Sequence, residues 1–326
     1  MMGRVTVVGS FMFDLVARAP RRPKTGETLI GDSFGMFIGG KGANQAIAAS
    51  RLNTLVCMVG RLGDDLFGNQ FLDKFLDEKI NTDFVIQDKN NGTGVGMPLI
   101  DASGDNSIVI IPRANMALSV EDINQGYEAI ANSDILLLQL EVPIEASQRA
   151  AEIAKENSTI VILNPAPARE IPDTLLDLVD ILTPNESETE ILSGISATTG
   201  KEAKEAARIL MDKGVETVIL TLGSRGSLLL TATVESFFPA NKVDVVDTTA
   251  AGDAFCGALA ASLANGSTIE EAVKTGNAAG ALAVTKLGAE PSLPKKADLD
   301  RFLAINCPGI NQDLLNTGES HFFPIL

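Results

Sequence analysis

The sequence predicts an α/β fold with a doubly wound, mostly parallel central sheet, helices on both faces, and a small additional β-sheet. Strand-like and helix-like segments alternate over most of the chain, as a doubly wound sheet requires. Residues 135–140 and 160–163 are continuous apolar runs, which are typical of parallel strands buried on both faces. Residues 94–100 and 107–111 break the alternation, because they flank a turn at 101–104 and form a hairpin pattern.

The first third of the chain contains the elements that should begin the fold. Its pattern predicts strands over residues 5–8 and 55–59 and a helix over residues 66–78. Four apolar residues should share one face of that helix: Phe67, Phe71, Phe75 and Leu76. A β-rich stretch with several glycines, residues 14–37, accompanies the hairpin.

The remaining elements continue the alternation toward the C-terminus. In chain order we expect a helix capped by Ser119 that ends near residue 131, a helix over 201–213 closed by Gly214, a strand over 217–222, a strand over 242–246 and a small-residue helix over 254–264. Serine accepts hydrogen bonds from the free amides that begin a helix, and glycine adopts the left-handed backbone that often ends one.

Composition excludes several classes of function. A chain of 326 residues is long enough for one large α/β domain or two smaller ones. Its net charge of −16 opposes binding to nucleic acid or to anionic membranes. Three widely spaced cysteines match no metal or redox pattern and fit reduced thiols in the cytoplasm. His321 is the single histidine, so most histidine-based mechanisms are excluded. No apolar run reaches the ~18 residues of a membrane helix.

The segment from Asp247 to Asp253, which reads Asp-Thr-Thr-Ala-Ala-Gly-Asp, carries the strongest functional signal. It joins a strand-like segment to a helix. Free backbone amides at the start of a helix bind anions, and a neighbouring carboxylate can orient a hydroxyl toward a bound phosphoryl group. The segment therefore indicates a phosphotransferase.

This segment resembles the C-terminal signature of the ribokinase (PfkB-type) sugar kinases. Two further signatures agree: residues 39–46, Gly-Gly-Lys-Gly-Ala-Asn-Gln-Ala, and residues 185–188, the Asn-x-x-Glu of the family. The three occur in the order and at the separations typical of the family, and the resemblance covers residues 4–303. It implies a ribokinase-like kinase domain over residues 1–303.

The resemblance also implies a lid and a partner. Residues 14–37 and 94–113 should form a small sheet that covers the sugar site and joins two copies of the chain in a homodimer. Residues 304–326 lie beyond the last helix of the family, and no function is predicted for this tail.

The resemblance implies a sugar site formed by convergent polar groups. Its predicted members are Met12, Asp14, Gly39, Gly40, Lys41, Asn44, Glu141 and Asp253. Asp14 should accept hydrogen bonds from two sugar hydroxyls, because an ionised carboxylate is an acceptor only. The two glycines should let the backbone approach the sugar, and Glu141 should meet its anomeric end.

Two positions depart from the family pattern. Met12 stands where ribokinases usually carry asparagine, and a thioether is a weak acceptor and no donor. A ribose hydroxyl facing it would lose a partner, at a cost of about 1–3 kcal/mol. We retain D-ribose as the predicted substrate and 2-deoxy-D-ribose as the alternative. Arg113 stands where relatives carry a small residue, and its role is left open.

The resemblance assigns the catalytic groups and the sites of ATP and Mg²⁺. Asp253 should take the proton from the O5 hydroxyl of the sugar, while the backbone amides of Ala250, Ala251 and Gly252 receive the negative charge of the transferred phosphoryl group. Glu188 should bind Mg²⁺ through a water molecule. The predicted nucleotide contacts are Asn185, Glu188, Thr221, Gly223, Ser224, Gly226, Gly252 and Asn277.

The resemblance also implies a site for K⁺ beside the anion-binding turn. Its predicted ligands are Asp247, Thr249, Ala283, Lys286, Gly288 and Ser292, most of them through backbone carbonyls.

Other functions are weaker interpretations of the same residues. Residues 35–42 nearly match a P-loop, but Gly42 lacks the hydroxyl that binds Mg²⁺. No strand leads into the glycine pattern of a nicotinamide-binding fold. A sugar sensor without activity would be expected to lose Gly252 or Asp253, and both are present. A nucleoside kinase or a fructokinase stays open.

Overall fold

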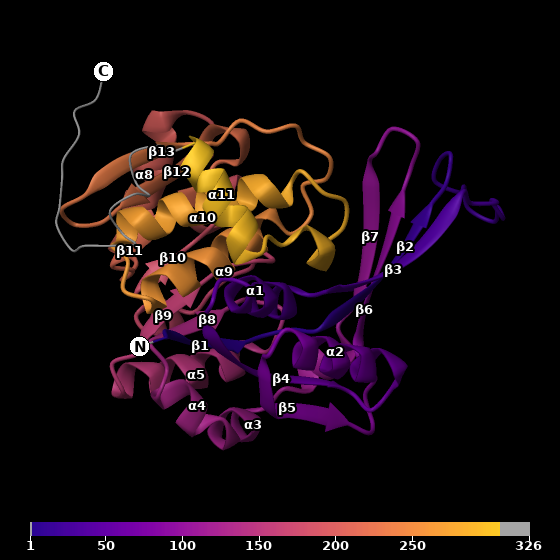
Figure 1. The fold of residues 1–326 in the computed structure, drawn as a ribbon, viewed down its shortest axis with the longest axis horizontal. Coiled ribbons are helices and arrows are strands. Elements are labelled where there is room, and N and C mark those ends of the chain that lie inside the picture. Colours follow the sequence, from indigo (N-terminus) through magenta and orange to yellow (C-terminus); the bar gives the residue numbers. More distant parts are fainter. Residues whose placement is uncertain (1, 307–326) are drawn as a thin grey trace.

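The computed structural model describes residues 2–306, and its main body is one large sheet between two layers of helices (Figure 1). In these residues the sheet has nine strands, which are, in order across it, β13 (Glu235–Pro239), β12 (Gly226–Leu230), β11 (Thr217–Thr221), β10 (Ile181–Leu182), β9 (Ile160–Leu163), β8 (Ile135–Leu138), β1 (Arg4–Val8), β4 (Leu55–Gly63) and β5 (Asn81–Asp88). Every neighbouring pair from β11 to β5 is parallel, and β12 is antiparallel to both of its neighbours. The predicted doubly wound, mostly parallel sheet is confirmed.

Alternate residues of the central strands face two separate apolar cores. In β1, Val5 and Val7 belong to one core and Val8 to the other. The first core is shared with α1 (Lys41–Ser50), α2 (Leu66–Asp77), α9 (Ala251–Ala264), α10 (Ile269–Ala283) and α11 (Lys296–Asn306). The second is shared with α3 (Val120–Gln125), α4 (Tyr127–Ala131), α5 (Ile144–Glu156), α6 (Asp173–Leu176), α7 (Glu186–Ser193) and α8 (Gly200–Asp212). Burial on both faces explains why β8 and β9 are apolar without a break.

A second sheet of four strands projects from the body (Figure 1). Its order is β3 (Ser33–Gly39), β2 (Met12–Arg18), β6 (Gly94–Ile100) and β7 (Asn106–Ile111). The β6–β7 hairpin is antiparallel as predicted, whereas β2 and β6 run parallel and join the two predicted β-rich pieces. We call this sheet the lid sheet.

Two predicted elements differ from the structure. Residues 242–246 form no strand: Val245 and Val246 are 64% and 61% exposed, and the amide of Val246 donates to the carbonyl of Val284 at 2.7 Å. The helix after Ser119 is interrupted at Gly126, which separates α3 from α4. Ser119 does cap α3 as predicted. Residues 242–246 have the alternating pattern of a strand, but in residues 2–306 no neighbouring strand pairs with them.

The predicted buried face of one helix and the predicted end of the domain also differ from the structure. Leu76 is 76% exposed, while Phe71 and Phe75 are fully buried, because the helix turns about 100° between residues 75 and 76. Helix α11 continues to Asn306, three residues past the predicted end of the domain. The rest of the predicted tail, including Cys307 and His321, lies outside the described residues. In residues 2–306 no helix is long and apolar enough to cross a bilayer.

Candidate active site

The turn before α9 places a carboxylate beside backbone amides that have no helical partner. Ala250 adopts the left-handed conformation, with φ of 59°, and the helix begins at Ala251. The predicted start at residue 254 was therefore too late, and Gly252 and Asp253 belong to the first turn, where amides have no carbonyl four residues earlier to bind. A β-carbon added at Gly252 would meet no heavy atom within 4 Å, so this part of the backbone faces open space.

Two amide side chains of α1 hold the carboxylate of Asp253. Asn44 Nδ2 donates to Oδ2 at 2.9 Å, and Gln45 Nε2 donates to Oδ1 at 3.0 Å. The amide of Gln45 is itself oriented, because its Oε1 accepts from Gln139 at 2.6 Å. Burial raises the pKa of Asp253, while Lys41 and the two amides act against that rise. The carboxylate is therefore fixed in orientation before any substrate arrives.

Gln45 and Gln139 are site residues that the sequence did not reveal as such. Both lie within or next to recognised motifs, but 94 residues separate them in the chain. Asn164 extends the same network, since its Oδ1 accepts from Gln45 Nε2 at 3.1 Å and its Nδ2 donates to the carbonyl of Thr183. Only the folded chain shows that these amides support the carboxylate of Asp253.

A cavity of about 380 Å³ lies between the lid sheet and the body. It is lined by most of the predicted sugar-site residues: Met12, Asp14, Gly40, Lys41, Asn44, Glu141 and Asp253. Lid residues such as Val16, Pro98 and Ile108 form part of its wall. Asn44 Oδ1 is buried and accepts no hydrogen bond from the described residues, so its capacity as an acceptor is unused within residues 2–306.

Asp14 and Glu141 are two of the carboxylates that line this cavity. Burial, followed by the charges of Glu141 and Asp253, raises the pKa of Asp14 to about 6. Glu141 Oε2 accepts from Ser10 Oγ at 2.5 Å and from the amide of Lys41 at 2.9 Å. These two bonds fix Glu141 at the start of α1.

Gly39 makes room for the carboxylate of Asp14. It does not line the cavity, and a β-carbon at this position would collide with Asp14 Oδ2. Gly96 lies on β6, next to the strand that carries Asp14, and a β-carbon at Gly96 would collide with Asp14 Oδ1. Gly40 does line the cavity, and its φ of 86° requires glycine. The glycines therefore make space for the carboxylate as well as for a ligand.

A second cavity of about 200 Å³ adjoins the first. Its lining includes Asn164, Thr183, Asn185, Glu188, Thr221, Thr248, Ala251 and Gly252. Lys41, Ala250 and Asp253 line both cavities and therefore mark their junction. Burial lowers the pKa of Lys41, but the charges of Asp253, Glu141 and Glu188 outweigh this effect and raise it. The Lys41 ammonium is therefore held charged among carboxylates.

Asn185 and Glu188 form a capping box at the start of α7. Asn185 Oδ1 accepts from the amide of Glu188 at 2.9 Å, and Glu188 Oε2 accepts from the amide of Asn185 at 2.8 Å. Asparagine followed three residues later by glutamate is a recognisable start of a helix, so this local role was available from the sequence. Glu188 is buried, and burial raises the pKa of its carboxyl. Both residues also line the second cavity.

Four of the predicted nucleotide residues lie outside both cavities. Thr221 lines the second cavity, but Gly223, Ser224, Gly226 and Asn277 do not. Gly223 and Ser224 belong to the short helix η2 (Gly223–Arg225), directly after β11. Asn277 lies on α10, with its Nδ2 3.5 Å from the carbonyl of Phe238.

Asp247 joins the two loops in which the K⁺ ligands were predicted. Its Oδ1 accepts from the amide and the hydroxyl of Thr249, at 3.0 and 2.6 Å, and its Oδ2 accepts from the amide of Gly288 at 2.9 Å. The other predicted positions, Ala283, Lys286 and Ser292, belong to the second loop and its flanks. In residues 2–306, no three His, Cys, Asp or Glu side chains are grouped as metal ligands.

Arg113 is not among the residues that line the larger cavity. Its Nη1 donates to the carbonyl of Thr93 at 3.0 Å and lies 3.9 Å from Asp65 Oδ2. Asp65 in turn caps α2 by accepting from the amide of Gly68. Arg113 therefore fastens the base of the lid sheet to the body.

The fold and these cavities agree with comparisons to known proteins. The pfkB family carbohydrate kinase model matches residues 2–296. A ribokinase of Haemophilus influenzae is 41% identical, and the match covers 92% of this chain and 98% of the relative. A deoxyribokinase of Salmonella typhi is 39% identical over 93% of this chain and 99% of the relative.

A solved structure shares the fold closely. The structure of Arabidopsis thaliana ribokinase complexed with ribose and ATP is similar with a TM-score of 0.87 and 34% identity, covering 93% of this chain and 99% of that one. The chain belongs to the pfkB family of carbohydrate kinases. Within that family it is similar to ribokinases and to deoxyribokinases at comparable identity.

Proposed function

We propose that this protein transfers the γ-phosphoryl group of ATP to O5 of D-ribose. The observation that carries the proposal is the position of Asp253. Its buried carboxylate lies at the junction of two adjoining cavities, beside the exposed first turn of α9. The larger cavity, which lies under the lid sheet, suits a sugar, and the smaller one suits phosphates.

The larger cavity offers the groups that a pentose requires. The carboxylate of Asp14 would accept hydrogen bonds from two hydroxyls, and Asn44 Oδ1 would accept from a third. Glu141 retains Oε1 for the anomeric end, because its Oε2 is already bound by Ser10 and Lys41. The left-handed backbone of Gly40 would allow the ring to approach α1.

Asp253 would act as the base. Its carboxylate would accept the proton of the O5 hydroxyl as that oxygen attacks phosphorus, and the leaving oxygen would depart on ADP. Transfer of this kind depends mainly on alignment, so the fixed orientation imposed by Asn44 and Gln45 contributes directly. The amides of the Ala250–Gly252 turn and the ammonium of Lys41 would stabilise the negative charge on the transferred group.

The smaller cavity would hold the phosphates of ATP. Asn185 would contact the triphosphate, and the loop with Thr221, Gly223, Ser224 and Gly226, followed by Asn277, would lead toward the adenosine. A single buried carboxylate, Glu188, suits Mg²⁺ that keeps most of its water ligands. Bound Mg²⁺ would neutralise phosphate charge.

The loops joined by Asp247 suit a monovalent cation such as K⁺. The donors are all oxygens: the Asp247 carboxylate, the Ser292 hydroxyl and the carbonyls of Thr249, Ala283, Lys286 and Gly288. Oxygen ligands suit a hard cation. When bound, the ion would hold these loops together beside the turn that precedes α9.

A second candidate substrate is 2-deoxy-D-ribose. Met12 lines the sugar cavity on the first residue of β2, directly opposite Gly39 on one neighbouring strand and Gly94 on the other. Its buried thioether offers no hydrogen-bond donor at this position. An apolar wall favours a sugar that lacks the hydroxyl facing it.

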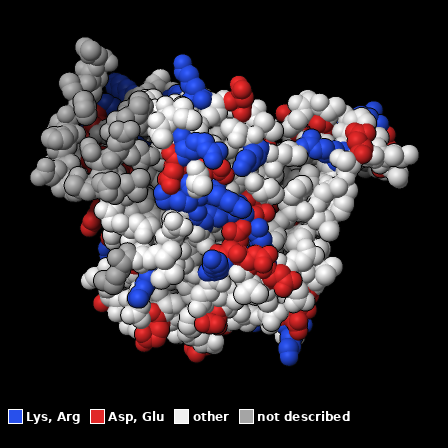
Figure 2. Space-filling model, in the orientation of Figure 1, with Lys and Arg blue, Asp and Glu red and all other residues white. Residues whose placement is uncertain are grey.

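We also propose that the lid sheet joins two copies of the chain. Strand β7 is exposed throughout, and its residues Ile108, Val109, Ile110 and Ile111 are between 45% and 61% exposed. Figure 2 shows mostly uncharged atoms over this part of the lid on the face drawn. An exposed apolar edge strand favours association. Replacement of Ile108 and Ile110 by lysine should convert a dimer to monomer in sedimentation.

Location in the cytoplasm stays a prediction.

The proposal is tested by ATP-dependent turnover with Mg²⁺ on D-ribose and on 2-deoxy-D-ribose, each with K⁺ and with Na⁺ alone. Turnover on ribose with 5-phosphate as product supports the main proposal. Preference for the deoxy sugar supports the second candidate. Absence of turnover on both sugars would contradict the proposed substrate class.

A further inference from the structure

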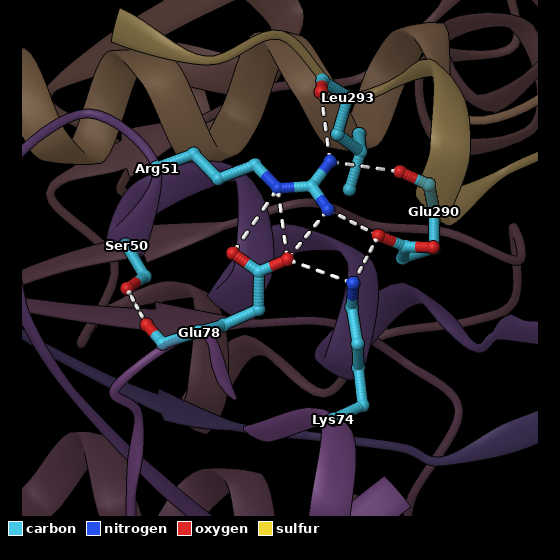
Figure 3. A network of polar contacts seen from close by, with 6 residues as sticks. All are labelled: Ser50, Arg51, Lys74, Glu78, Glu290 and Leu293. Atoms are coloured by element: carbon cyan, nitrogen blue, oxygen red, sulfur yellow. Dashed lines mark hydrogen bonds and ion pairs between the residues drawn. The ribbon is translucent and has the colours of Figure 1, made fainter. Parts of the chain in front are cut away.

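Four charged side chains meet where α1, α2 and the short helix η3 (Glu290–Ser292) come together (Figure 3). Arg51 Nη2 and Lys74 Nζ lie 2.6 and 2.9 Å from Glu78 Oε1. Both cations also pair with Glu290, Lys74 at 2.7 Å. The network therefore contains two positive and two negative charges and joins segments that are more than 200 residues apart.

This network is largely removed from solvent. The side chains of Arg51, Glu78 and Glu290 are 7%, 14% and 15% exposed, and that of Lys74 is 26% exposed. Buried ion pairs often contribute little net stability compared with apolar residues of similar size, because the charges must give up their hydration. Their geometry, however, is highly specific. Specific geometry suggests a role in fixing the position of the segments that they join.

Arg51 differs from Lys74 because it also binds the main chain of the segment 290–293. Its Nη1 donates to the carbonyl of Glu290 at 2.9 Å and to the carbonyl of Leu293 at 2.8 Å. Figure 3 shows the guanidinium between these two carbonyls and the carboxylate of Glu78. Lys74 contacts the same two carboxylates and has no such main-chain bond. Arg51 alone of these two cations holds both ends of the segment.

The held segment directly follows part of the sugar cavity. Leu287, Gly288 and Ala289 line that cavity, and the amide of Gly288 donates to Asp247 Oδ2. Gly288 also faces the ring of Phe37 on lid strand β3: a β-carbon at this glycine would lie 3.5 Å from Phe37 Cδ1. The backbone fixed by Arg51 thus leads to the cavity wall, the lid and the turn before α9.

The second part that Arg51 connects is helix α1, at whose C-terminal end Arg51 lies. Arg51 is the C-cap of this helix, whose first turns carry Lys41, Asn44 and Gln45. We propose that Arg51 is a positioning residue that fixes the 287–289 wall of the sugar cavity relative to α1. The inference rests on the proposed sugar-kinase function.

The test compares two variants that disturb the same ion pairs. Arg51→Lys keeps the charge but loses the planar fork that reaches both carbonyls. Lys74→Gln removes a charge and leaves those two bonds in place. We expect Arg51→Lys to lower kcat/KM for the sugar by about 5–10-fold, mainly through KM, as two hydrogen bonds are lost. Lys74→Gln should stay within about 2-fold of wild type, whatever its effect on Tm, since it touches no main chain of the segment.

Hydrogen exchange supplies a readout that does not require turnover. Amides of residues 286–289 should exchange faster in Arg51→Lys than in Lys74→Gln. The double variant Arg51→Met, Glu78→Leu removes one charge of each sign and serves if Arg51→Lys does not fold. Equal kinetic and exchange effects in the arginine and lysine variants, or a lower Tm with unchanged KM in Arg51→Lys, would overturn the inference. Wild-type protein without sugar turnover would contradict the proposed function, while the exchange comparison would still test the role of Arg51.

Discussion

Replacement of Gly252 by Ala adds one methyl group at the second position of α9, where the backbone is proposed to face the transferred phosphoryl group. In the structure a β-carbon at this position meets no heavy atom within 4 Å, and the backbone of Gly252 is not left-handed. The methyl group therefore collides with no part of the protein. It would stand beside the amides that a phosphoryl oxygen has to approach.

The structure gives opposite expectations for folding and for catalysis. Alanine is favoured over glycine in a helix by up to ~1 kcal/mol, so the free energy of unfolding should stay equal or rise by that amount. The amide of residue 252 is still present in the variant, but the methyl group would keep a phosphoryl oxygen from approaching it. Such a block equals the loss of one donor to a developing oxyanion, which costs about 2.7–4 kcal/mol and corresponds to a fall in kcat of about 100- to 1,000-fold. A stable and inactive protein is the expected result.

The assay measures kcat by coupled detection of ADP and the free energy of unfolding by urea titration. Gly200→Ala is the matched control, because Gly200 opens α8 and also has no neighbour within 4 Å of an added β-carbon. The control should match the stability change and leave kcat unaffected. Gly252→Ala with near-wild-type turnover would refute the assignment of this turn as the anion site.

Four further predictions concern the proposed sugar cavity and the proposed base. Asp253→Asn should lower kcat by orders of magnitude while isothermal titration still detects sugar binding, and normal turnover would rule out a role as base. The pKa of Asp14 is raised from 3.8 to about 6, chiefly by burial. As the pH falls through 6 the carboxylate is protonated and accepts fewer hydrogen bonds from the sugar, so KM for the sugar should rise. A flat KM between pH 5 and 7 would contradict this expectation. The pKa of Asp14 is higher in the folded protein than in the unfolded chain, so its contribution to stability is complete below pH 3.8 and is lost as the pH rises through 6. Asparagine carries no charge at either pH. Asp14→Asn should therefore raise Tm more at pH 8 than at pH 5. Met12→Asn should shift the ratio of kcat/KM values toward ribose by about 5- to 100-fold relative to 2-deoxyribose, and an unchanged ratio would leave Met12 as a packing residue.

Elements whose formation depends on residues close together in the sequence were predicted well. The apolar runs that became β8 and β9 identified buried parallel strands, and the hairpin of β6 and β7 lies where its turn indicated. The same local information was misleading at residues 242–246. Alternating Val and Asp favour a strand, but the formation of a strand depends on a neighbour that only the tertiary structure supplies.

The candidate site shows the same division. Asp253 and Gly252 were recognised because a turn, an amide and a carboxylate occur together in the sequence. The support for Asp253 was not recognised, because Gln45 and Gln139 become partners only after strand β8 and helix α1 pack together. Gly39 was recognised from its motif, but only the fold shows that its lack of a side chain makes room for Asp14.

The sequence by itself determined the family, the alternating order of strands and helices, and the residues that we propose form an anion-binding turn, because each of these depends on short segments whose physical chemistry is local. The tertiary structure decided which distant residues share a cavity and which side chains hold the carboxylate of Asp253 in place. It also decided that Arg51, at the far end of α1, binds the backbone beside the sugar cavity. Hydrogen bonds and ion pairs between distant segments depend on distances of about 3 Å, and those distances are fixed only when the whole chain has packed.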